Sequence, residues 1–113
     1  MALKTLKQYV ADIEANKENP GALSQLAVEL SADYMFCADA IIPIKLKKAT
    51  EWTNIKRSEE KPLSDKLTDM LWAQTLEGQD EIRLKYRMKS LEKALSSIKS
   101  HIYIKNQESH NQY

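Results

Sequence analysis

The chain has few of the residues that interrupt helices or that build small disulfide-linked folds. Its 113 residues include two glycines, three prolines and one cysteine. A β-sandwich of this length needs many more turn residues, so the composition argues against that class. The single cysteine, Cys37, cannot form an intrachain disulfide and lies in an apolar run, which indicates a reducing compartment and a buried structural thiol.

Long hydrophobic runs are also missing. The longest apolar stretch, residues 34–46, is interrupted by Asp39, Pro43 and Lys45, and it is too short and too polar to span a bilayer. The N-terminus lacks the apolar core and the small-residue cleavage site of a signal peptide. These absences predict a cytoplasmic protein.

No group of residues has the spacing of a catalytic or metal site. The two histidines, His101 and His110, have no metal-ligand partner at helical spacing, and the two glycines are too far apart for a phosphate-binding loop. The acidic pair Asp80-Glu81, at the start of a predicted helix, is explained as a complement to the helix macrodipole. We therefore expect no catalytic residue, no metal and no cofactor, and we expect that the protein is not an enzyme.

Helical periodicity is what the sequence does contain. Apolar residues recur at alternating spacings of four and three, which is the 3.5-residue period of a helix packed lengthwise against another helix. One such seam comprises Leu84, Met88, Leu91, Leu95, Ile98 and Ile102. A second comprises Leu23, Ala27, Leu30, Tyr34, Cys37, Ile41 and Ile44.

Caps and breaks divide the chain into helices predicted at about residues 3–16, 20–57, 63–74 and 76–105. Asn19 and Thr75 are expected N-caps, and Pro43 is expected to kink the second helix. The polar residues 106–113 are predicted to form a flexible tail. The sequence thus predicts one all-α domain over residues 1–113, an elongated antiparallel helical hairpin or bundle of about four helices with coiled-coil-like packing.

The second predicted helix carries more apolar residues than one seam can use. Its middle is apolar nearly all round, which is typical of a helix buried on more than one side. The residues assigned to a protein-partner or homodimer interface are Met35, Phe36, Ile41, Ile42 and Ile44. Burial inside a three- or four-helix core is the alternative explanation, and it applies to Trp72 as well.

Charges alternate in blocks although the net charge is only +1. Residues 41–58 carry five basic and one acidic side chain (+4), residues 59–81 two and seven (−5), and residues 82–113 seven and two (+5). If the last helix runs antiparallel to the second, the basic blocks come together. The residues that could then contact nucleic acid or an acidic partner are Lys45, Lys47, Lys48, Lys56, Arg57, Arg83, Lys85, Arg87 and Lys89. The alternative is that these blocks face the acidic block within the fold or across a dimer.

Short segments near the C-terminus carry a family resemblance. They are Trp72, Thr75-Leu76-Glu77-Gly78-Gln79, Leu84-Lys85-Tyr86, Lys89-Ser90-Leu91-Glu92-Lys93-Ala94-Leu95-Ser96-Ser97-Ile98 and Asn111-Gln112-Tyr113. Over residues 70–113 the chain resembles small helical accessory proteins encoded by phages and prophages. The resemblance implies the cytoplasm of a bacterial host. It also implies a role in inhibiting a host or defence enzyme, adapting replication or recombination machinery, or assisting assembly.

The sequence therefore predicts a non-enzymatic, phage-type interaction protein. It would bind and modulate a protein partner, inhibiting or recruiting a nucleic-acid enzyme or a host defence complex. The alternatives are a nucleic-acid-binding module that uses its basic helical end, and a phage scaffold or assembly protein. We expect a host or phage protein as partner, a homodimer, and no membrane contact.

Overall fold

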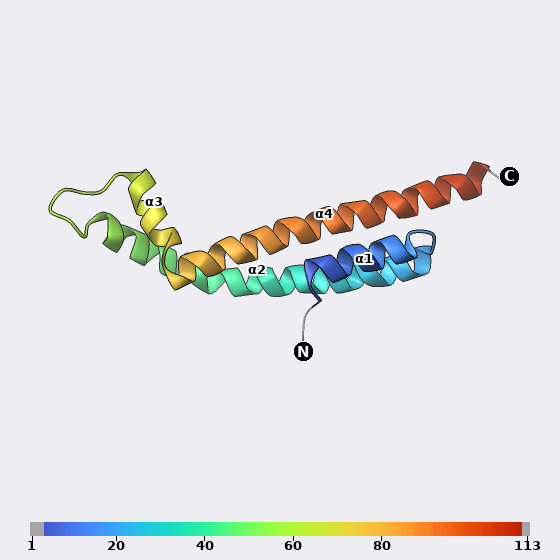
Figure 1. Ribbon diagram of the computed structural model, residues 1–113, viewed down its shortest axis with the longest axis horizontal. Helices are drawn as coiled ribbons and strands as arrows, with labels where there is room; N and C mark the ends of the chain where they lie inside the picture. Colours follow the sequence, from blue (N-terminus) through green and yellow to red (C-terminus); the bar gives the residue numbers. More distant parts are fainter. Residues whose placement is uncertain (1–3, 112–113) are drawn as a thin grey trace. The chain divides into compact units, whose positions relative to one another are not determined.

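The computed structural model describes the backbone of residues 4–111 and the side chains of residues 4–108. Within these residues the chain forms four α-helices and no strand. The helices are α1 (Leu6–Asn16), α2 (Pro20–Lys56), α3 (Asp65–Ala73) and α4 (Leu76–Asn111), as Figure 1 shows. The prediction of an all-α protein is confirmed.

Side-chain caps set where the helices begin. Thr5 Oγ1 accepts a hydrogen bond from the Gln8 N–H (3.1 Å), and Gln8 Oε1 accepts one from the Thr5 N–H (2.8 Å). This capping box starts α1 at Leu6, three residues later than predicted. Asn19 and Thr75 are confirmed as caps, because the side-chain oxygen of each accepts a backbone N–H three residues further on.

The end of α4 differs from the prediction, and Pro43 lies inside α2 without ending it. The last helix continues to Asn111 instead of ending near residue 105, since no helix breaker follows and Lys105 pairs with Glu108 one turn on (3.4 Å). Residues 106–111 of the predicted tail are therefore helical, and residues 112–113 lie outside the described part. Pro43 does not end α2, which is helical on both sides of it.

The chain divides into two compact units, each of which contains part of α2 and part of α4. In the described part of the chain, unit 1 is formed by residues 4–36 and 87–111, and unit 2 by residues 37–86. Unit 1 therefore holds all of α1, and unit 2 holds all of α3.

The core of unit 1 is built from the predicted seams. Leu23, Leu30, Leu91 and Ile98 are almost completely buried. In this unit α2 and α4 run antiparallel. Asp33 of α2 pairs with Arg87 of α4, whereas Glu18, which precedes α2, pairs with Lys105, which lies further along α4. The 3.5-residue pattern thus identified the buried faces of both long helices in this unit.

A buried polar cluster ties α1 to the two long helices of unit 1. Asp33 is only 2 % exposed and accepts hydrogen bonds from Arg87 Nε (3.1 Å) and Nη2 (2.5 Å) and from the Tyr9 hydroxyl (3.1 Å). Arg87 Nη2 also donates to the Lys4 carbonyl (2.7 Å). Burial, together with the bond to Asp33, raises the pKa of Tyr9 to about 12. The eleven-residue α1 is too short to persist alone, so these contacts and Ile13 hold it in place.

Candidate functional site

In unit 2 the basic block of α2 faces the acidic block that follows it in the sequence. Three lysines of α2 form ion pairs with carboxylates of α3 and α4: Lys47 with Glu77, Lys48 with Glu81 (3.1 Å) and Lys56 with Asp65 (2.5 Å). Trp52, one turn before Lys56, bonds to Asp69, one turn after Asp65, so the end of α2 runs antiparallel to α3. These contacts correspond to internal pairing of the charge blocks, the alternative to a nucleic-acid site.

Most of the nine basic residues assigned to nucleic-acid contact have acidic neighbours. Besides the three lysines of α2, Arg83 pairs with Asp80 and Lys85 with Glu81 inside α4. Arg87 belongs to unit 1, where it pairs with Asp33. Only three of the nine have no ion-pair partner among the side chains of residues 4–108, and all three are exposed: Lys45, Arg57 and Lys89.

Glu81 is a buried acceptor and not a surface complement to the helix dipole. Its carboxylate is 5 % exposed and accepts hydrogen bonds from Lys48 (3.1 Å) and from Trp72 Nε1 (3.2 Å). Burial on its own would raise the pKa of Glu81, but the two hydrogen bonds and the charges of Lys48 and Lys85 hold it below the ordinary value. The sequence pattern did not identify this role, because nothing in it places Trp72 or Lys48 beside Glu81.

Replacing Glu81 by glutamine should change the pH dependence of stability. Because the folded state lowers the pKa of Glu81 below 4.5, the carboxylate stabilises the fold above that pH and loses this contribution as the pH falls. We expect a loss of roughly 1.5–3 kcal/mol at neutral pH. We also expect the unfolding free energy to decline less steeply between about pH 5 and pH 3 than in the unaltered protein. Urea unfolding followed by tryptophan fluorescence measures both, with Glu59→Gln in the exposed connector as control. Equal slopes for Glu81→Gln and the unaltered protein would contradict the assignment.

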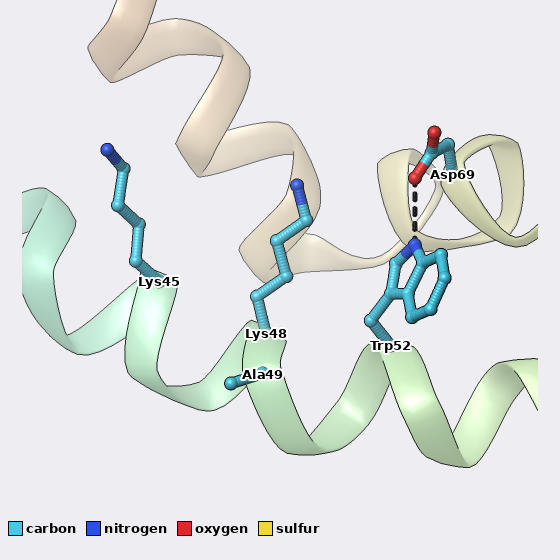
Figure 2. Close-up of a pocket in the computed structure, with 5 residues that line it drawn as sticks. All are labelled: Lys45, Lys48, Ala49, Trp52 and Asp69. Atoms are coloured by element: carbon cyan, nitrogen blue, oxygen red, sulfur yellow. Dashed lines mark hydrogen bonds between the residues drawn. The ribbon is translucent and has the colours of Figure 1, made fainter. Parts of the chain in front are cut away.

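An open hollow of about 400 Å³ lies beside Trp52 in unit 2. Figure 2 shows the residues that line it: Lys45, Lys48, Ala49, Trp52 and Asp69. Trp52 Nε1 donates to Asp69 Oδ1 (2.8 Å), and Lys56 Nζ lies 5.4 Å from the centre of the Trp52 ring. Of the charged groups that line the hollow, Lys45 alone has neither a hydrogen-bond nor an ion-pair partner among the described side chains.

The part of α2 in unit 2 has two different faces. Cys37, Ile41, Ile44 and Lys48, at spacings of four, three and four, are buried or half-buried. The opposite face presents Asp39, Ile42, Leu46 and Ala49, at spacings of three, four and three, and all four are exposed. Ile42 is 53 % and Leu46 70 % exposed. We call these four residues, with the adjacent exposed Lys45, the Ile42 patch.

The residues predicted to form a partner interface differ in how exposed they are. Met35 and Phe36, in unit 1, and Ile42, in unit 2, are more than half exposed. Ile41 is 5 % exposed and Ile44 half-buried, so this assignment is corrected for both: they belong to the seam that packs inside the chain.

Trp72 is buried, as its alternative explanation in the core requires. Leu46 was not singled out, although its spacing of four from Ile42 could have identified it. Periodicity predicts which residues share a face, but it does not say which face is covered.

Among the side chains of residues 4–108, no three His, Cys, Asp or Glu residues gather so that they could hold a metal ion. No helix within residues 4–111 is both long and apolar enough to cross a membrane. Comparison with known protein families, with curated proteins and with solved structures finds no match to this chain. The similarity to phage accessory proteins therefore stays a prediction.

Proposed function

We propose that this chain is a non-enzymatic interaction protein that binds a protein partner through the Ile42 patch. The observation that carries the proposal is the exposure of Ile42 and Leu46 one turn apart on a helix whose other face is packed. Adjacent exposed aliphatic side chains are favourable to cover, at about 25 cal/mol for each Å² of apolar surface removed from water. Two such residues in the centre of an interface can act as its anchor.

The partner that we propose is a phage or host protein in the bacterial cytoplasm, such as a nucleic-acid enzyme or a defence complex that the chain inhibits or recruits. The resemblance of residues 70–113 to phage accessory proteins supports this choice. The internal pairing of Lys47, Lys48 and Lys56 supports a protein partner over nucleic acid, because each ammonium group already has a carboxylate beside it.

The double variant Ile42→Asp/Leu46→Asp is expected to weaken partner binding by roughly 30-fold or more, because each new carboxylate would have to lose water in the contact. Both positions are exposed, so helicity should not change. The measurement is an affinity pull-down from a bacterial lysate with and without nuclease, read by mass spectrometry, followed by titration of the recovered protein.

Ile82→Asp is the matched control, because Ile82 is also in unit 2 and its exposed fraction of 54 % is nearly the same as the 53 % of Ile42. Ile41 is unsuitable for this test, since an aspartate at that buried site would unfold the helix packing. Equal recovery with the double variant and with Ile82→Asp would overturn the proposal. Recovery that disappears after nuclease would favour nucleic-acid binding instead.

A further inference from the structure

The Ile42 patch has an acidic residue at one edge and a basic residue at the other. Asp39 precedes Ile42 by three residues and Lys45 follows it by three. In an α-helix each is therefore displaced about 4.5 Å along the axis and about 60° around it, in opposite directions from Ile42. Neither Asp39 nor Lys45 has an ion-pair partner among the side chains of residues 4–108, and both are exposed.

Other exposed apolar residues of unit 2 do not have this arrangement. Ile82 is followed one turn later by the exposed Tyr86, but the neighbouring Arg83 and Lys85 already pair with carboxylates of α4. Ile42 therefore has an exposed charge of each sign, neither of them in an ion pair within the described side chains, three residues before and three residues after it.

An arrangement that is symmetric about its central residue is complementary to itself. In a two-fold interface the same surface is used by both subunits, so that residue i contacts j and j contacts i. A two-fold axis that lies in the contact plane beside Ile42, perpendicular to the line from Asp39 to Lys45, brings Ile42 against Ile42. The same axis places Asp39 of each copy against Lys45 of the other.

We infer that the Ile42 patch binds a second copy of this chain, with Ile42 at the two-fold axis and two Asp39–Lys45 ion pairs between the copies. This inference rests on the proposed function: a second copy covers the patch in the free protein, and the phage or host partner competes with it for the same surface. The charges select the partner: any arrangement that puts like charges together is penalised, whereas the two-fold arrangement matches both.

Charge reversal tests the pairing directly. Asp39→Lys leaves two lysines at the edges of the patch and Lys45→Asp leaves two aspartates, so each single variant repels itself. We expect each to weaken self-association at least tenfold. An equimolar mixture of the two variants should recover association to within about threefold, as a heterodimer with both pairs restored, and so should the double variant Asp39→Lys/Lys45→Asp. Sedimentation velocity over a range of concentrations measures association of the two single variants, of their mixture and of the double variant. In the mixture one variant carries a fluorescent label.

Arg57→Asp is the control, because Arg57 is also an exposed, unpaired basic residue of unit 2 and should leave association unchanged. Circular dichroism of every variant excludes a change in helicity as the cause. A monomer at every concentration, or a dimer that neither single reversal weakens, would overturn the inference. The protein could instead be monomeric while Ile42→Asp/Leu46→Asp still abolishes binding to a protein captured from the lysate. That result would contradict the self-association and leave the proposed function supported.

Discussion

Replacing Arg87 by alanine is expected to lower the free energy of unfolding by roughly 3–5 kcal/mol. The substitution removes both guanidinium hydrogen bonds to Asp33 and leaves that carboxylate, 2 % exposed, with the Tyr9 hydroxyl as a remaining donor. A buried charge without its counter-charge costs far more than an exposed ion pair contributes. The loss also releases the contact between Arg87 and the Lys4 carbonyl, which precedes α1. Urea unfolding at neutral pH, followed by circular dichroism, gives the difference.

Lys89→Ala provides the comparison, because Lys89 is on the same helix, exposed, and without an ion pair among the described side chains. Its effect should stay within about 0.5 kcal/mol. Arg87→Lys should fall between the two, since an ammonium group keeps the charge but cannot form the two-pronged contact with Asp33. If Arg87→Ala and Lys89→Ala unfold at the same urea concentration, the buried pair does not hold unit 1 together.

The second large effect is expected at the corner between α3 and α4. A Cβ atom added at Gly78 would lie 1.9 Å from the Trp72 carbonyl oxygen and 2.7 Å from its carbon. Both are backbone atoms, so the clash cannot be relieved by rotating a side chain. Gly78→Ala must therefore displace the corner, where the Gly78 N–H donates to Thr75 Oγ1 and the Thr75 hydroxyl donates to the Trp72 carbonyl. We expect a loss of roughly 2–4 kcal/mol, measured by thermal unfolding.

Gly21 is the matched control for this prediction. A Cβ atom at Gly21 would meet only Asn19 Oδ1, at an ordinary 3.5 Å. Gly21→Ala should therefore stabilise α2 slightly, by up to about 1 kcal/mol, because alanine loses less backbone freedom than glycine on folding. A Gly78→Ala variant as stable as Gly21→Ala would show that the close approach to Trp72 is not maintained.

The number, order and approximate ends of the helices could be predicted from the sequence because their signals are local. Caps such as Asn19 and Thr75 act on backbone groups three residues away. The seam residues recur with the period of the helix itself, so Leu91 and Ile98 could be assigned to a buried face before any partner was known. The end of α4 could not be predicted as well, because a run of polar residues can form either a helix or a tail.

The candidate site could be predicted only in part. The apolar excess of α2 pointed to its middle, and Met35, Phe36 and Ile42 are exposed there. Ile41 and Ile44 were assigned to the same surface because a helix that is apolar all round gives no indication of which face is covered.

The set of helices, their caps and the residues that share each face follow from local sequence. Each of these depends on atoms within a few residues along one chain. Tertiary structure alone decided that Arg87 pairs with Asp33, that Trp72 and Lys48 meet at Glu81, and that the Ile42 patch stays uncovered. These contacts join residues from 9 to 54 positions apart, and which of many lysines meets which carboxylate depends on how whole helix faces pack. The sequence around a charged residue does not indicate its ion-pair partner. The packing of the apolar faces determines which charged residues meet.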